Sequence, residues 1–198
     1  MDNESSATYE AFLAERPSEH VLEISGASES KLGMSLSAFN LRIDTLDGRR
    51  YSVESAFQSS KVFEHGGPYK DLLDMSSREA KKDPRLKNSG RLTAFRFSGK
   101  VFPLTPRTYF YDWLYINALC LHPELTAPMT EYTAFTDIAF NPERSLNCQA
   151  HAAAVYVSLR RCGTLDEALK SHTDFLRVVY GEDEVASARE QLTLWDGW

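Results

Sequence analysis

The clearest chemical pattern in this sequence is a stripe of three polar residues at helical spacing. Glu54, Gln58 and Lys61 stand at positions i, i+4 and i+7 within the string VESAFQSSK. On a helix these positions share one face, and two turns separate Glu54 from Lys61 by about 10 Å along the axis. A sugar fits between a carboxylate and an amine at that spacing. The pattern predicts a helix over residues 53–64 that presents an acid–base pair.

A lysine amine attacks a carbonyl carbon only when it is neutral, so burial or a neighbouring charge must depress its pKa. A nearby carboxylate can move protons for such a step. The same stripe is also typical of the solvated face of an ordinary amphipathic helix, which is its commoner meaning. Spacing alone therefore does not establish an active site.

The segments on either side of this helix define its ends. Residues 39–44 alternate apolar and polar side chains up to the turn signal Asp47-Gly48, which predicts a β-hairpin. Ser52 is placed to cap the helix by accepting a hydrogen bond from a first-turn N–H group. The glycine pair before Pro68 is a stop signal.

Further helices and one more β segment are predicted downstream. We expect helical turns over 69–74 and 76–82, a β segment over 92–102, and helices over 106–121, 145–161 and 165–178. The cap signals are Ser76 with Glu79, Thr105 before Pro106, and Thr164 with Glu167. These elements predict an α+β fold, a predominantly helical single domain with a small β-sheet.

Length and composition suit one globular core with acidic ends. The chain has 198 residues and a formal net charge of −6, which does not favour a protein that coats nucleic acid or an anionic membrane. We divide it into an acidic polar lead-in over 1–32, a catalytic domain over 33–181 and an acidic C-terminal tail over 182–198. Leu192, Leu194, Trp195 and Trp198 give the tail apolar side chains with which to dock.

Several function classes are disfavoured by missing patterns. There is no basic start followed by an apolar run and no stretch of eighteen apolar residues, so we expect a cytoplasmic protein that contacts no membrane. The three cysteines form no CxxC pair, and Cys148 with His151 lacks a second pair of ligands, so we predict no metal. The phosphate-loop, dinucleotide and hydrolase-elbow motifs are absent, and no cofactor is expected.

Ordered motifs in this chain resemble the NADAR family (NAD and ADP-ribose associated). The string VESAFQSSKVF matches the family signature Val-Glu-x-x-Phe-Gln-x-x-Lys-x-Phe. The strings SSREAKKDPRLKNSGRL and FTDIAFNPERSLNCQA follow in the family's order. Together with GGPYKDLL and FYDWLYINAL, they are most similar to a subtype associated with DarT-type, guanine-directed DNA ADP-ribosylating toxins. The likeness spans about residues 39–180.

The resemblance implies an ADP-ribosyl N-glycosidase that restores guanine in DNA, as antitoxin to a DarT-type toxin or as a phage counter to one. It gives Lys61 the role of capturing the opened ribose as a Schiff base and Glu54 that of moving protons. Asp137 would orient ribose hydroxyls, although Ile138-Ala139-Phe140 replaces the usual Trp-Gly dipeptide that follows it and leaves this role open. The substrate-binding residues are expected to be Gln58, Ser60, Gly67, Lys81, Arg91, Trp113 and Asn147.

The expected partners are ADP-ribosylated single-stranded DNA and a cognate DarT-type toxin. A run of lysines and arginines over 78–100 suits a pyrophosphate or a nucleic-acid backbone, but also an ordinary solvated surface. Gly67 could offer its N–H group to a phosphate, and Trp113 could stack on a base, although helix termination and core packing explain these residues as well. Two other functions remain open: hydrolysis of phosphoribosyl-amine metabolites, and non-catalytic binding of ADP-ribose or a toxin.

Overall fold

The computed structural model describes residues 20–137 and 148–193 as an α+β fold, which confirms the predicted class. The strands are β1 (Val21–Glu23), β2 (Arg42–Asp44), β3 (Arg50–Ser52), β4 (Lys61–Phe63), β5 (Leu92–Phe97), β6 (Lys100–Phe102) and β7 (Ala134–Thr136). The helices are α2 (Lys31–Leu36), α3 (Val53–Ser59), the 3₁₀ helix η1 (Lys70–Asp74), α4 (Ser77–Lys82), α5 (Arg85–Asn88), α6 (Tyr109–Cys120), α7 (Pro123–Met129), α8 (Gln149–Cys162), α9 (Leu165–Ala168), α10 (His172–Tyr180) and α11 (Glu182–Thr193).

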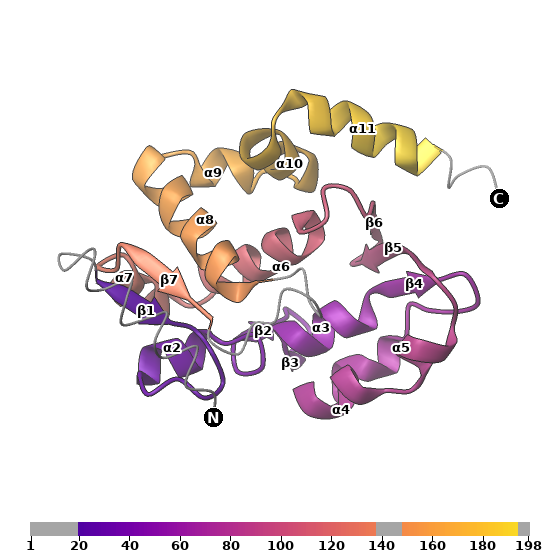
Figure 1. Ribbon diagram of the computed structural model, residues 1–198, viewed down its shortest axis with the longest axis horizontal. Coiled ribbons are helices and arrows are strands. Elements are labelled where there is room, and N and C mark those ends of the chain that lie inside the picture. The colour runs from indigo at the N-terminus through magenta and orange to yellow at the C-terminus, as the bar shows by residue number, and fades with distance from the viewer. Residues whose placement is uncertain (1–19, 138–147, 194–198) are drawn as a thin grey trace, which may run out of the picture.

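Short strands form three small sheets around the helices. β4, β5 and β6 make an antiparallel sheet in that order, β2 and β3 form a hairpin, and β1 pairs in parallel with β7. In the first of these sheets Lys61 lies opposite Phe95. The β1–β7 pair joins residues more than a hundred positions apart, and it lies next to α2 at the left of Figure 1.

The aromatic helix α6 is the centre of the core. It contacts α3, α7, α8 and α10, and it lies between α3 and the α8–α10 region in Figure 1. Phe110 stacks on Phe95 with ring centroids 4.7 Å apart, and Phe57 of α3 packs on the same pair. Most of the aromatic residues at helical spacing are therefore core, and they hold α3 against the β4–β5–β6 sheet.

The helix predicted over 53–64 is too long, because α3 ends at Ser59 and Lys61 begins β4. The hydroxyls of Ser59 and Ser60 both donate to the Ala56 carbonyl oxygen, at 2.9 and 2.7 Å, and so take up the last turn of the helix. The Ser60 carbonyl oxygen then accepts a hydrogen bond from the Arg96 N–H group of β5. Pairing with β5 thus outcompetes continuation of the helix.

Other cap predictions have mixed outcomes. Ser52 caps α3, and Ser76 with Glu79 forms the predicted capping box of α4. α6 begins only at Tyr109, with Thr108 at its N-cap position, so Pro106 is not the first helical residue.

The predicted helix over 165–178 is divided into α9 and α10. Thr164 makes no side-chain cap, whereas the Ser171 hydroxyl accepts a hydrogen bond from the Asp174 N–H group and starts α10. Residues 145–147 of the helix expected over 145–161 lie outside the described residues, and α8 begins at Gln149.

Both acidic ends contribute elements to the described structure. β1 and the start of α2 lie in the segment proposed as a lead-in, and β1 pairs with β7. α11 lies in the proposed tail and packs against α10 with Val185 and Ala188 buried (Figure 1). No helix within 20–137 or 148–193 has both the length and the apolar character that crossing a membrane requires.

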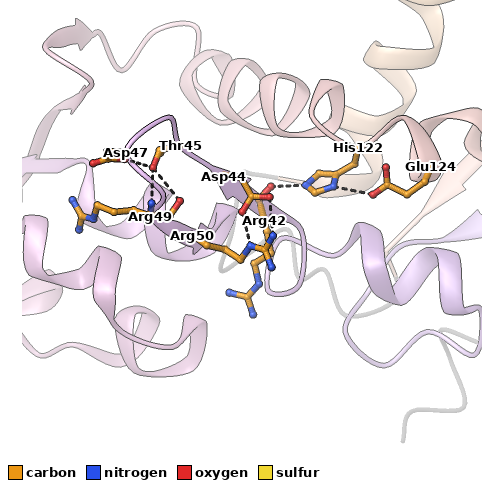
Figure 2. A network of polar contacts seen from close by, with 8 residues as sticks. All are labelled: Arg42, Asp44, Thr45, Asp47, Arg49, Arg50, His122 and Glu124. Atoms are coloured by element: carbon orange, nitrogen blue, oxygen red, sulfur yellow. Dashed lines mark hydrogen bonds and ion pairs between the residues drawn. The ribbon is translucent and has the colours of Figure 1, made fainter.

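The hairpin that leads into α3 is held to the turn between α6 and α7. Figure 2 shows His122 between the two, with its Nε2 atom 2.8 Å from the Arg42 carbonyl oxygen and its Nδ1 atom 3.0 Å from Glu124. Arg50 and Asp44 pair across the hairpin. Because β3 runs directly into α3, these contacts help to set the position of the α3 N-terminus.

A buried carboxylate links three helices of the core. Asp112 of α6 is fully buried, and its Oδ2 atom accepts a hydrogen bond from the Tyr180 hydroxyl at 2.6 Å. His151 of α8 places Nδ1 3.3 Å from the same oxygen. The hydrogen bond to Asp112 raises the pKa of His151, so this ion pair weakens as the pH rises through that raised pKa.

We expect Tyr180→Phe to lower the free energy of unfolding by about 2 kcal/mol, because it leaves a buried carboxylate short of a donor. Urea denaturation measures this difference. Tyr156→Phe on α8 is the matched control, since Tyr156 is another buried tyrosine of the same core. Equal losses in the two variants would show that the Asp112 bond contributes nothing.

Candidate active site

Lys61 has the environment that an amine nucleophile needs. Its side chain is half-buried at the start of β4, and the Nζ atom lies 4.9 Å from the centre of the Phe57 ring. Burial lowers the pKa of Lys61 to about 8; the negative charge of Glu54 raises this pKa and the positive charge of Lys81 lowers it. With such a pKa roughly a tenth of the amines are neutral at pH 7. Lys61 is therefore equipped to attack an electrophilic carbon.

Glu54 lies in the first turn of α3 and is only 6% exposed. The positive end of the helix dipole favours a carboxylate there. Its Oε1 atom accepts a hydrogen bond from Gln58 Nε2 at 2.9 Å, and Lys81 Nζ lies 3.8 Å from the same atom. The sequence pattern predicted that Glu54 is the partner of Lys61, but the structure shows its carboxylate bound to Gln58 and Lys81.

Gln58 carries an unsatisfied acceptor beside this carboxylate. Its amide must turn Nε2 toward Glu54, because an ionised carboxylate can only accept. The Gln58 Oε1 atom is then buried without a hydrogen-bond partner among residues 20–137 and 148–193. Buried acceptors are normally satisfied, so this oxygen suits a donor on a bound molecule, such as a sugar hydroxyl.

Asp137 directly follows β7 and lies near the same helices. The pKa of Tyr111 on α6 stands well above its ordinary value because of burial first, then Tyr115 and the charges of Glu54, Asp112 and Asp137. The Tyr111 ring meets Phe57 edge-on at 5.3 Å. The structure therefore places the charges of Glu54 and Asp137 both near Tyr111, whereas Asp137 does not contribute to the pKa shift of Lys61.

Ser60 and Gly67 support the backbone at Lys61. Ser60 is buried, and its hydroxyl donates a hydrogen bond to the Ala56 carbonyl oxygen. Gly67 has a φ of +83°, and a β-carbon there would lie 2.3 Å from the Lys61 carbonyl oxygen. Only glycine fits such a close approach without movement of the chain. The contacts of both residues thus position the backbone of Lys61. That they also bind substrate stays a prediction.

Three other predicted binding residues lie apart from this region or outside the described structure. Trp113 stands two positions from Tyr111 on α6 and so faces nearly the opposite way, where it packs on Phe102 with ring centroids 4.9 Å apart. Arg91 is exposed and pairs with Glu64 at 3.1 Å. Asn147 lies outside the described residues.

Gln149 is a positioning residue that the sequence did not reveal. Its Oε1 atom accepts a hydrogen bond from the Ala38 N–H group, and its Nε2 atom donates to the Ile24 carbonyl oxygen, both at 2.8 Å. The Ala38 carbonyl oxygen in turn accepts from the Glu54 N–H group. The start of α8 is thereby connected to the start of α3. The only sequence signal for this role is that Gln149 lies in the motif string SLNCQA. The residues to which it bonds are 111 and 125 positions away in the chain.

The basic region over 78–100 is partly neutralised by acidic neighbours. Arg85 pairs with Asp71 and Asp83, and Arg91 pairs with Glu64. The exposed residues of this region that form no ion pair within the described structure include Arg78, Lys82, Lys87 and Lys100. The region thus presents a smaller positive surface than the sequence suggests.

A cavity of about 100 Å³ lies elsewhere, between β6, α10 and α11. Tyr109, His172 and Leu176 line it, and none of the predicted site residues does. Among residues 20–137 and 148–193 there is no group of three or more His, Cys, Asp or Glu side chains that could hold a metal ion. The candidate site itself offers the amine of Lys61, the carboxylate of Glu54 and the amide of Gln58.

Comparison with known proteins gives one result for nearly the whole chain. The model of the family NADAR-DarT1, described as DarT1-associated NADAR antitoxin, matches residues 3–189. No curated protein matches the chain. The matched range contains Glu54, Lys61 and Asp137, so the candidate site lies within the shared part of the chain.

Proposed function

This chain belongs to the DarT1-associated NADAR antitoxin family, and we propose that it removes ADP-ribose from guanine bases in DNA. Membership confirms the family resemblance of its motifs. NADAR proteins are generally ADP-ribose glycohydrolases, and the family name associates this one with a DarT1 toxin. In our proposal the chain is an N-glycosidase that reverses the modification made by a cognate DarT-type toxin, or that serves a phage as a counter to one.

The observation that carries the proposal is the half-buried Lys61 amine beside a buried carboxylate. Burial lowers the pKa of Lys61 to about 8, while Glu54 is close enough to affect that pKa. An ordinary structural lysine has no need of such a position, because the desolvation of an ammonium group costs free energy. The pair suits a reaction that begins with a neutral amine and requires proton transfer.

In the proposed reaction the C1″–O4″ bond of the ribose joined to guanine breaks, the proton of the linking guanine N–H group is transferred to O4″, and C1″ becomes doubly bonded to the guanine nitrogen. The Lys61 amine adds to C1″, and guanine leaves from the same carbon after its nitrogen takes a proton. Lys61 is then joined to C1″ as a Schiff base. Water adds to C1″, the Lys61 amine departs, and ring closure gives free ADP-ribose. Glu54 accepts the protons lost by the amine and by water and returns them to the leaving nitrogens.

Two further residues support the binding of a sugar in this position. The buried Gln58 Oε1 atom lacks a donor within the described structure and would accept a hydrogen bond from a ribose hydroxyl. Asp137, at the end of β7, would take another hydroxyl, since carboxylates are strong acceptors. These roles explain why polar groups accumulate beside the apolar rings of Phe57 and Tyr111.

The test is release of ADP-ribose from a single-stranded oligonucleotide that carries the modification on guanine. We expect free ADP-ribose and an unmodified oligonucleotide, both followed by mass spectrometry, and a higher kcat/KM than on a phosphoribosyl-amine metabolite. A preference for the metabolite would favour the alternative N-glycosidase. Tight binding of the oligonucleotide without release would favour a non-catalytic module.

A further inference from the structure

Lys81 of α4 faces the candidate site from a different element than Glu54 or Lys61. Its Nζ atom lies 3.8 Å from Glu54 Oε1 and 5.0 Å from the centre of the Phe39 ring. The Lys81 side chain is 56% exposed, whereas that of Glu54 is 8% exposed. The lysine stem therefore reaches inward from the surface to a buried carboxylate, and the aromatic face helps to hold its ammonium group.

We propose that Lys81 is a positioning residue that serves as the counter-ion of Glu54 and so keeps this carboxylate from pairing with the Lys61 amine. Glu54 Oε1 accepts a hydrogen bond from Gln58 and forms an ion pair with Lys81. Within the described structure Lys61 forms no ion pair, and its Nζ atom lies over the Phe57 ring. The inference rests on the proposed function for its catalytic meaning, but the arrangement of charges can be tested by itself.

The charges that face Lys61 come from two helices. Glu54 on α3 raises the pKa of Lys61 and Lys81 on α4 lowers it, while burial is the largest cause of the depressed value. The strand beside β4 places the uncharged Phe95 opposite Lys61, and Arg96 next to it bonds through its N–H group to the Ser60 carbonyl oxygen. No other charged group contributes to the shift of Lys61 within the described residues.

Loss of the Lys81 charge has two effects of the same sign. It removes a positive charge that disfavours protonation of Lys61, and it frees the Glu54 carboxylate to stabilise the Lys61 ammonium form. Both raise the pKa of Lys61 and reduce the neutral fraction at pH 7. Because Lys81 is more than half exposed, solvent screens part of this effect. We therefore expect a change of about three- to tenfold in the neutral fraction, where tenfold corresponds to one pKa unit.

The experiment measures the reactivity of Lys61 directly. The whole protein is reductively methylated with formaldehyde and cyanoborohydride from pH 6 to pH 10, and modification of Lys61 is followed by peptide mass spectrometry. In Lys81→Gln the labelling rate at pH 7 should fall about three- to tenfold and approach the wild-type rate near pH 10. Lys81→Arg keeps the charge and should restore the profile. Lys31→Gln, an exposed residue of α2, is the control.

Identical pH profiles for wild type and Lys81→Gln would overturn the proposal, provided that urea denaturation shows both to be folded. A uniform fall in labelling at every pH would also contradict it, since that result indicates a change in access to Lys61. Release of ADP-ribose is measured on the same variants. A shifted labelling profile without any lysine-dependent release would contradict the proposed function and leave the role of Lys81 in place.

Discussion

Lys61→Ala is expected to lower the turnover of guanine-ADP-ribosylated DNA by about 10⁴-fold or more, as removal of a covalent nucleophile does. The expected loss is large because no other amine is as suitably placed within the described structure: Lys81 is mostly exposed and faces Glu54. Lys61→Arg should be equally inactive, since a guanidinium stays protonated and does not form a Schiff base. Lys170→Ala, an exposed lysine between α9 and α10, should keep full activity.

Borohydride supplies a second measurement of the same step. Added during turnover, it should reduce the Schiff base and leave on the peptide that contains Lys61, in wild type only, an added mass equal to ADP-ribose less one oxygen atom. The activity of the wild-type enzyme should rise with pH up to about 8, because the amine becomes neutral as the pH approaches its lowered pKa. Undiminished release of ADP-ribose by Lys61→Ala would exclude this lysine from the mechanism.

Glu54→Gln is expected to reduce kcat by about 10²- to 10⁴-fold, the usual contribution of a general acid–base group. The change keeps the shape of the side chain, and an amide can still form a hydrogen bond with Gln58. The sign of the electrostatic effect makes this variant informative. The charge of Glu54 raises the pKa of Lys61, so its removal alone would increase the neutral amine at pH 7. A lower rate then reports the loss of proton transfer.

Glu29→Gln provides the matched control, because it removes one exposed carboxylate outside the candidate site. Single-turnover measurements should show the loss in the Glu54 variant at the chemical step with little change in oligonucleotide binding. If Glu54→Gln turned over at the wild-type rate, the proton would have to move through a group other than Glu54.

The same variants separate an enzyme from a protective binding module in cells. Under expression of the cognate toxin, an enzyme that depends on Lys61 and Glu54 protects only when both residues are present. A double variant that still protected as well as wild type would favour neutralisation of the toxin by direct contact. Soluble expression of the double variant is the control for this comparison.

Local signals in the sequence determined several elements of the fold. Ser52 caps α3, and Ser76 with Glu79 forms the capping box of α4, because these bonds join residues only three positions apart. The Asp47-Gly48 turn produces the predicted hairpin, since glycine readily adopts the positive φ of 80° found at Gly48. The aromatic run over 109–116 lies in the core helix α6, where burial of its large apolar rings stabilises the fold.

The order of the motifs along the chain also indicates the family, and the match over residues 3–189 agrees with it. The order of the motifs does not indicate which secondary-structure element carries Lys61. Helical spacing placed Glu54, Gln58 and Lys61 on one stripe, but Lys61 begins a strand that pairs with residues 29 to 34 positions further along. Periodicity cannot reveal such a pairing, because the N–H group that bonds to the Ser60 carbonyl oxygen at the end of α3 belongs to Arg96 of β5.

Only the tertiary structure decided the electrostatics of the candidate site. The ion pair of Lys81 with Glu54, the bonds of Gln149 near α3 and the position of Asp137 all join segments that are distant in the chain. The pKa of an amine depends on how much water and which charges surround it, and these follow from packing. The types and order of the residues thus indicated which chemical groups belong to the candidate site. How deeply these groups are buried and which partners they have follow only from the folded chain.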